Sequence, residues 1–451
     1  MESKLRAGYA CVDALPEIGT PICGYYIERR MEGVLDPLQV VAVFLSYENE
    51  KVLIVTVDHS GLMKEDVAQA IEAITAVVDV PKDNIFIHAT HTHTAAGPSL
   101  TYGENDKQYI EYKKELYKKI ALSAVLAYQD LKPAKLGYGI GEAKKVAFVR
   151  RFRMKDGSIQ TNPGVNNPDI LAPIGDVDER VNVLRLDREG APTIVIANFG
   201  NHPDTVGGSK VSADWPGFTR KFVEKAIDNT KCIFINGAQG DVNHVNVHPS
   251  GGDFNDMFND FDGCSRGYGH ARHIGRVVAG AVMQVYDKVN YVDVDCLKMA
   301  KKVVKIPSHK ANEEQLAIAR KYDALHKADK DDQIPYKGMM LTTVVAEAKR
   351  MLSLENGPDF YELTMCGIRL GDVYLIGFPG EPFTGIGRDT KNILGKGLIL
   401  PCCTVNDSAG YFPTKEAYDE GGYEARSSVF GPSVSSEVLS GAKNIIEQLN
   451  K

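Results

Sequence analysis

Apolar and polar positions follow two different periods along the chain. Residues 52–57 and 85–87 form continuous apolar runs, which are typical of strands buried on both faces of a sheet. In residues 67–78 and 107–131 the apolar positions recur at the spacing of one helix face. The order strand, helix, strand, helix is the pattern of an α/β protein.

The second half of the chain continues this pattern and adds one strongly helical segment. Strands are predicted at residues 181–186, 193–199 and 232–236. Residues 306–355 are rich in charged and helix-forming residues. Because the sequence has neither internal repeats nor low-complexity segments, we predict one domain over residues 1–451, in which 306–355 is a helical elaboration.

Three of the eleven histidines lie within six positions, directly after the apolar run at residues 85–87. If strand geometry continues, His91 and His93 project to one face and His88 to the other. Two neutral imidazoles at a strand end can hold or flank a divalent metal ion. The alternative is a group of histidines hydrogen-bonded to the backbone around a turn.

Two further polar side chains lie at predicted strand ends. His202 follows the strand at 193–199, and Pro203 biases the His202 backbone toward an extended shape. Glu381 follows a strand at 373–377 and lies between two prolines that fix its backbone. An acid in this place either favours the N-terminus of the next helix or serves as a metal ligand.

Three other segments can each be interpreted in two ways. Residues 148–153 place three arginines among aromatic residues, either in a surface edge strand or as a clamp for a carboxylate or an oxyanion. Tyr411 follows a glycine and is either a packed aromatic with a hydrogen-bonded hydroxyl or a metal-bound phenolate. Residues 248–269, rich in Gly and Asp, form either a mobile lid or an ordinary surface loop.

Composition narrows the partners that the chain can have. Its net charge of −7 argues against a nucleic-acid surface, which is basic. No apolar stretch reaches the roughly eighteen residues that a membrane span needs. The eight cysteines have no metal-like spacing and no apolar signal core follows the N-terminus, so we expect reduced thiols and a cytoplasmic protein. A small-molecule substrate fits this profile, and the sequence leaves a homo-oligomer open.

Five short blocks together resemble the zinc-dependent catalytic domain of the neutral ceramidase family. In chain order they are Thr90-His91-Thr92-His93, Asn198-Phe199-Gly200-Asn201-His202-Pro203, Gly237-Ala238-Gln239-Gly240-Asp241-Val242, Pro379-Gly380-Glu381 and Asn406-Asp407-Ser408-Ala409-Gly410-Tyr411. The resemblance covers most of the chain, from residue 8 to about residue 431. It implies an α/β fold that has a mixed β-sheet core and flanking helices.

The resemblance also implies a catalytic zinc ion (Zn2+). In the family two histidines, a glutamate and a tyrosine hold the metal, and the matching residues here are His91, His202, Glu381 and Tyr411. A ligand set of nitrogen and oxygen atoms, with a water molecule in an open position, is chemically reasonable for catalytic zinc.

Three more residues take catalytic places by the same resemblance. His93 would lie beside the metal and contact the substrate as an acid, a base or an orienting group. Arg150 would position the scissile carbonyl group. Where the family has a catalytic serine this chain has Asn243, which favours attack by metal-activated water and leaves Asn243 as a hydrogen-bond donor to an oxyanion.

These features predict a zinc-dependent hydrolase that cleaves a C–N amide bond. The family's larger members carry a C-terminal immunoglobulin-like domain and are secreted or membrane-attached. For a short cytosolic relative without that domain we expect a small polar substrate, such as an N-acyl amino sugar, rather than ceramide. Two alternatives stay open: a metal-dependent lyase or isomerase acting on a sugar-like compound, and a non-catalytic metabolite-binding protein with a structural metal.

Overall fold

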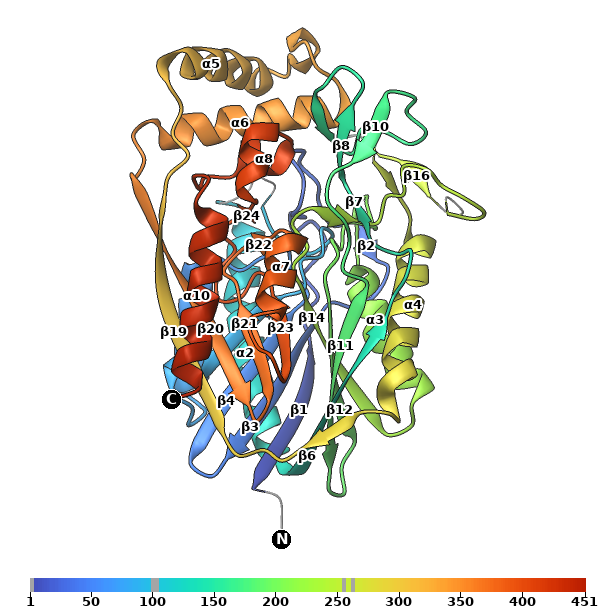
Figure 1. The fold of residues 1–451 in the computed structure, drawn as a ribbon, viewed down its shortest axis with the longest axis vertical. Helices are drawn as coiled ribbons and strands as arrows, with labels where there is room; N and C mark the ends of the chain where they lie inside the picture. The colour runs from blue at the N-terminus through green and yellow to red at the C-terminus, as the bar shows by residue number, and fades with distance from the viewer. Residues whose placement is uncertain (1–3, 99–104, 254–256, 261–263) are drawn as a thin grey trace.

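Two packed β-sheets with helices on their outer sides make up the molecule (Figure 1). The structure is a computed structural model that describes residues 4–98, 105–253, 257–260 and 264–451. The larger sheet has nine strands in the order β14-β12-β11-β6-β1-β3-β4-β5, with β18 beside β6. These strands are β1 (Leu5–Asp13), β3 (Gln39–Tyr47), β4 (Glu50–Val57), β5 (Ile85–Ala89), β6 (Lys132–Glu142), β11 (Arg180–Arg188), β12 (Thr193–Phe199), β14 (Thr230–Asn236) and β18 (Asn290–Val292).

The larger sheet is mixed. Strand β5 runs parallel to β4, and β14 runs parallel to β12, while the other pairs are antiparallel. The smaller sheet has the order β19-β20-β21-β23 and is also mixed. Its strands are β19 (Leu297–Pro307), β20 (Phe360–Leu370), β21 (Val373–Gly377) and β23 (Leu398–Cys402). The expected α/β class with a mixed sheet and flanking helices is confirmed.

The continuous apolar strands are explained by burial on both faces of the larger sheet. In β3, Ala42 and Phe44 belong to the core that lies under the helices. Val43 and Leu45, which alternate with them, belong to the core shared with the smaller sheet. Because successive side chains of a strand point to opposite faces, both sets must be apolar.

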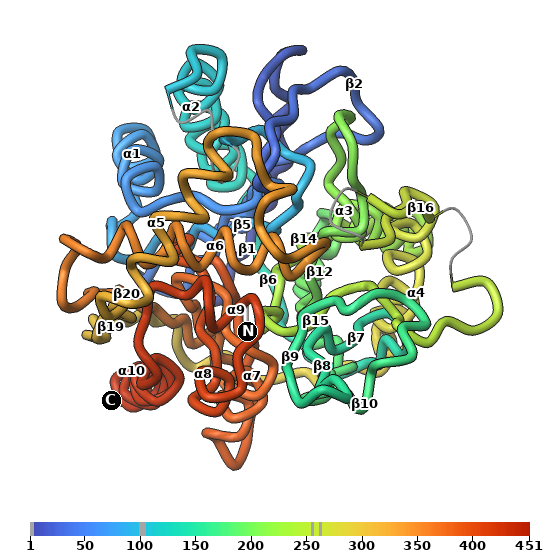
Figure 2. Tube along the Cα trace, turned by 90° about the horizontal axis from the view of Figure 1, so that it is seen from above, coloured from blue at the N-terminus to red at the C-terminus, as the bar shows by residue number. Residues whose placement is uncertain are grey.

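Helices cover the outer sides of both sheets (Figure 2). The larger sheet is covered by α1 (Lys64–Thr75), α2 (Lys107–Gln129), α3 (Asp214–Ala226) and α4 (Tyr268–Tyr286). The smaller sheet is covered by α7 (Thr384–Lys391) and α10 (Val434–Leu449). Among the residues that the structure describes, none of the helices combines the length and the apolar character that a bilayer crossing requires.

Two long helices are inserted at the end of one hairpin of the smaller sheet. Strands β19 and β20 pair along their whole length, from Leu297 with Leu370 to Pro307 with Phe360. The chain between them forms α5 (Glu313–Lys327) and α6 (Gly338–Glu355), which lie at the top of the molecule in Figure 1. Helix α6 packs on the short helix α9 (Tyr423–Ser427).

Several short elements connect the strands and helices already described. They are β2 (Gly33–Val34), β7 (Phe148–Val149), β8 (Arg151–Met154), β9 (Ile159–Thr161), β10 (Ile170–Pro173), β13 (Lys210–Val211), β15 (Val242–Asn243), β16 (Phe258–Asn259), β17 (Ser265–Arg266), β22 (Glu381–Pro382), β24 (Tyr411–Phe412), α8 (Lys415–Glu420) and the 3₁₀ turns η1 (Lys82–Asn84) and η2 (Asp331–Gln333). The loop considered as a lid includes residues 254–256 and 261–263, which lie outside the described residues.

Strands β5 and β14 stand at opposite ends of the sheet order, yet their carboxyl ends meet. The backbone N–H of Asn236, the last residue of β14, donates to Nε2 of His88 in β5 at 3.0 Å. Residues 403–406 lie between the two strands, because Cys403 N–H donates to the Asn236 carbonyl oxygen and Asn406 N–H donates to the Ile87 carbonyl oxygen. The loops that follow both strands are therefore brought to one place.

The close packing of α3 on α4 gives a test of this architecture. A Cβ atom added at Gly275 in α4 would lie 2.3 Å from Cβ of Phe218 in α3, whereas a Cβ at Gly280 would meet no atom within 4 Å. We expect Gly275→Ala to lower the free energy of unfolding by about 1–3 kcal/mol through overpacking. Gly280→Ala should raise it by up to about 1 kcal/mol through helix propensity. Urea unfolding of both variants measures this, and equal effects would contradict the packing.

Candidate metal centre

His91 and His93 converge through a turn rather than through strand alternation. Strand β5 ends at Ala89, and His91 has a left-handed backbone with φ of 73°. The turn is held in place because His91 N–H donates to the His59 carbonyl oxygen and His93 N–H donates to the Pro203 carbonyl oxygen. The Nε2 atoms of His91 and His93 lie 3.4 Å apart. The ring of His88 turns away, to Asn236.

His202 is oriented by two backbone carbonyl groups. Its Nδ1 lies 2.9 Å from the carbonyl oxygen of Gln239 and 3.1 Å from that of Val242. Carbonyl oxygens only accept hydrogen bonds, so Nδ1 carries the proton and Nε2 bears a lone pair. Burial, and next the charge of Arg150, lower the pKa of His202, which keeps the ring neutral.

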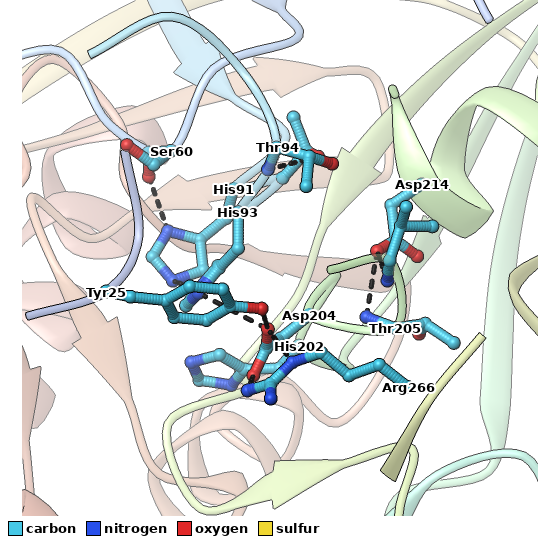
Figure 3. Close-up of polar contacts among 12 residues, drawn as sticks. Tyr25, Ser60, His91, His93, Thr94, His202, Asp204, Thr205, Asp214 and Arg266 are labelled. Carbon is cyan, nitrogen blue, oxygen red and sulfur yellow. Dashed lines mark hydrogen bonds and ion pairs between the residues drawn. The ribbon is translucent and has the colours of Figure 1, made fainter. Parts of the chain in front are cut away.

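Glu381 completes this group from the other sheet. Its Oε2 atom lies 3.3 Å from Nε2 of His91 and 3.2 Å from Nε2 of His202. His91 resembles His202, because its Nδ1 contacts the carbonyl oxygen of Ser60 (Figure 3).

The donor atoms fit a divalent metal ion. Nε2 of His202 and Oε2 of Glu381 are both acceptors, and both are buried without a hydrogen-bond partner, an arrangement that costs free energy unless a cation lies between them. In a tetrahedral zinc site with bonds of about 2.0–2.1 Å, neighbouring donor atoms lie about 3.3 Å apart. The separations of 3.2 and 3.3 Å match this value. His91, His93 and His202 also form a group, buried at His91 and His202 and partly exposed at His93, in which one ring nitrogen of each lies within 4.8 Å of the others.

Tyr411 lies beside this group because of strand pairing. Strands β22 and β24 are parallel and place Glu381 directly opposite Tyr411, so both side chains leave the same face. The Tyr411 ring stacks on the ring of His202 with centroids 6.2 Å apart. Burial and the nearby Glu381 raise the pKa of the Tyr411 hydroxyl, so its phenolate form requires a cation next to it.

Arg150 is a buried residue and not part of a surface edge strand. Its Nε donates to Oε1 of Glu424 at 2.6 Å, and its Nη2 donates to the Gly240 carbonyl oxygen at 2.7 Å. The guanidinium group lies 5.4 Å from the centroid of the Tyr411 ring. Arg150 is therefore held next to the histidine group by α9 and by the turn after β14.

Asn243 lies on β15, which pairs with β7 immediately before Arg150. Its Nδ2 donates to Oδ1 of Asn162 at 2.9 Å, and its Oδ1 accepts from Val245 N–H at 3.0 Å. An amide nitrogen has two hydrogens, so the hydrogen bond to Asn162 leaves one of them for a ligand.

Sequence reasoning missed the polar residues on the far side of His93. Oδ1 of Asp204 lies 3.6 Å from Nδ1 of His93 (Figure 3). Arg266 donates to both oxygens of Asp204, at 3.0 and 2.9 Å, and the Tyr25 hydroxyl donates to Oδ1. Of these three residues, only Asp204 could have been found from the sequence, because it lies two residues after His202. Tyr25 and Arg266 come from distant segments that no motif marks.

Comparison with solved structures identifies the fold. The neutral ceramidase from Pseudomonas aeruginosa superposes on the whole chain with a TM-score of 0.73 at 17% sequence identity, and the match covers 75% of the ceramidase chain. The chain has the neutral ceramidase fold. A ceramidase complexed with C2 matches to the same TM-score of 0.73 at 16% identity, over 100% of this chain and 76% of the other.

The resemblance carried by the five sequence blocks is thereby confirmed at the level of the fold. A scan against protein families finds no match, and neither does a comparison with curated proteins. At this level of identity the neutral ceramidase likeness establishes the architecture, and the chemistry has to be argued from the residues themselves.

Removal of His202 tests the metal centre directly. We expect about one zinc ion per chain in the purified protein and none in His202→Ala, because the variant loses a donor atom that lies 3.2 Å from Glu381. Elemental analysis measures the metal content. His273→Ala, on the exposed face of α4, is the matched control and should keep its zinc. Equal zinc in both variants would contradict the assignment.

Proposed function

We propose that the protein is a zinc-dependent hydrolase that cleaves the amide bond of a small N-acyl compound. One observation carries the proposal: acceptor atoms of His91, His202 and Glu381 converge in a buried place, and those of His202 and Glu381 have no hydrogen-bond partner among the described residues. The neutral ceramidase fold supports the choice of an amide bond, since ceramide is an N-acyl compound.

In this proposal His91, His202, Glu381 and Tyr411 hold the zinc ion. They provide a mixed nitrogen and oxygen set of the kind that catalytic zinc sites use. Bound zinc lowers the pKa of a water molecule toward neutrality and polarises a carbonyl group. The protein's own part is to fix the donor atoms, which it does through the carbonyl groups behind the rings of His91 and His202.

In this proposal His93 transfers the proton. Its Nε2 lies 3.4 Å from Nε2 of His91 and so adjoins the place where water and substrate would meet. His93 takes a proton from the attacking water as the C–O bond forms. It then gives that proton to the leaving nitrogen as the C–N bond breaks, so the ring ends neutral as it began.

Arg150 and Asn243 stabilise the negative charge that develops on the carbonyl oxygen of the substrate. Arg150 keeps its orientation through Glu424 and Gly240, which makes it a fixed positive group rather than a flexible one. Asn243 has one amide hydrogen left after its bond to Asn162. Because residue 243 has no hydroxyl group, water attacks the substrate directly and no acyl-enzyme forms at this position.

We further propose a polar substrate, such as an N-acyl amino sugar. The side chains beside His93 are charged or carry a hydroxyl, namely those of Tyr25, Asp204 and Arg266. These side chains bond to one another and Arg266 is fully buried, so they make the surroundings of the site polar without contacting the substrate. Polar surroundings suit a hydroxylated compound better than an apolar lipid chain.

Product analysis tests the reaction class. Hydrolysis of an N-acyl amino sugar should release a free amine and a carboxylate, with one oxygen from solvent in the carboxylate. A reaction in water labelled with a heavy oxygen isotope, followed by mass spectrometry, measures this. Activity should disappear with a zinc chelator and return with zinc. A product without solvent oxygen would point to a lyase or an isomerase, and turnover of ceramide alone would refute the polar substrate.

Arg150→Lys tests the oxyanion assignment. Lysine keeps the charge but has one nitrogen in place of the two that bond to Glu424 and Gly240, so its charge loses this fixed orientation and we expect kcat to fall about 100- to 1,000-fold. Zinc content should not change, because Arg150 is not a ligand. Arg153→Lys is the control, because Arg153 is exposed. Within the described part of the chain, its ion-pair partner is Glu420. A similar loss of kcat in both variants would contradict the role.

A further inference from the structure

A chain of charged side chains lies behind His93, on the side away from Glu381: Asp204 and Asp260 are partly buried and Arg266 is fully buried. His93 directs Nε2 to His91 and Nδ1 to Asp204, where the Nδ1 to Oδ1 distance is 3.6 Å. Nδ1 is buried and has no hydrogen-bond partner among the described residues, and the Asp204 carboxylate is the acceptor that it faces. The carboxylate of Asp204 is thus the group that decides which state of the Nδ1 atom is stable.

Asp204 itself is held rigidly. Arg266 bonds to both of its oxygens in the two-pronged geometry typical of arginine with a carboxylate. The Tyr25 hydroxyl donates to the oxygen that faces His93. Arg266 is fully buried and is also paired with Asp260, at 3.4 Å. These contacts leave the carboxylate little freedom to turn away from His93.

The backbone of His93 is fixed by a second arginine. Nη2 of Arg29 donates to the His93 carbonyl oxygen at 2.6 Å, and Nη1 donates to the carbonyl oxygen of Gly208 at 2.9 Å. The guanidinium groups of Arg29 and Arg266 lie 4.0 and 4.5 Å from the centroid of the Tyr25 ring. Both ends of the contact between His93 and Asp204 therefore belong to one packed cluster.

This geometry selects one form of the imidazole ring. A lone pair on Nδ1 would face a carboxylate oxygen in a buried place, which is repulsive, whereas an N–H at Nδ1 is attracted to it. We propose that Asp204 is a positioning residue that keeps the proton of His93 on Nδ1 and so presents Nε2 as a hydrogen-bond acceptor. His93 then begins the reaction as a base and not as an acid.

The role in turnover rests on the proposed function. When Nε2 receives the proton of the attacking water, the ring becomes positive and its Nδ1–H faces the negative Asp204, which stabilises that charge. The proton then leaves from Nε2 to the departing nitrogen, and Nδ1 keeps its own proton throughout. Asp204 contacts neither water nor substrate in this scheme.

Nuclear magnetic resonance of the zinc-loaded protein tests the proposal. Histidine labelled with a nitrogen isotope reports which ring nitrogen carries hydrogen, and comparison with His93→Gln assigns the signals of His93. We expect hydrogen on Nδ1 and none on Nε2 in the zinc-loaded protein. Hydrogen on Nε2 of the wild-type protein would overturn the proposal. The zinc content of the same sample is measured separately. A sample without zinc would contradict the metal assignment, whereas hydrogen on Nε2 in a sample with zinc would contradict the role of Asp204.

Variants separate positioning from a structural role. Asp204→Asn should retain zinc but move hydrogen from Nδ1 toward Nε2, and kcat should fall about 10- to 100-fold with little change in KM. Asp260→Asn removes a further carboxylate partner of Arg266 and should leave the ring form unchanged, because Asp204 stays bonded to Tyr25 and Arg266. An unaltered ring form in folded Asp204→Asn would contradict the proposal. If that variant does not fold, the position of the hydrogen on the His93 ring in the wild-type protein tests the proposal by itself.

Discussion

Backbone carbonyl groups decide the chemistry of the candidate metal centre. The carbonyl oxygen of Ser60 lies behind the ring of His91, and those of Gln239 and Val242 lie behind the ring of His202. Each accepts a hydrogen bond from Nδ1 of its ring. Because a carbonyl oxygen cannot donate, each ring is left with a lone pair on Nε2, directed at Glu381. Every later step of the proposed function depends on this, since a ring turned the other way would offer a proton where a ligand is needed.

Those carbonyl groups come together only because the two ends of the larger sheet meet. Ser60 follows β4, and Gln239 and Val242 follow β14, far from β4 in the order of strands. Residues 403–406 are hydrogen-bonded to both β5 and β14. Glu381 reaches the group from the layer of the smaller sheet. The centre thus lies where both sheets and this connecting segment join, at the carboxyl ends of strands.

The spacing of apolar residues was sufficient to predict the α/β class of the fold. Strands that are buried on both faces appear in the sequence as continuous apolar runs, such as residues 52–57. Strand ends also marked His202 and Glu381 as candidates. The periods could not reveal the left-handed turn at His91, which a local pattern does not encode. They could not decide whether Arg150 is exposed, since its burial depends on Glu424 in a distant helix. The contacts of Asp204 are long-range in the same sense.

The inserted helices α5 and α6 leave the sheet beneath them undisturbed, because β19 and β20 stay paired up to Pro307 and Phe360. A change in the length of this insertion would leave the register of β19 and β20 as it is, because the strand pairing ends before the insertion begins. Its contact with α9 still connects it to the centre, because α9 carries the glutamate that holds Arg150. A change in the inserted helices can therefore reach Arg150, the proposed oxyanion group, through α9, without a change in the proposed metal ligands.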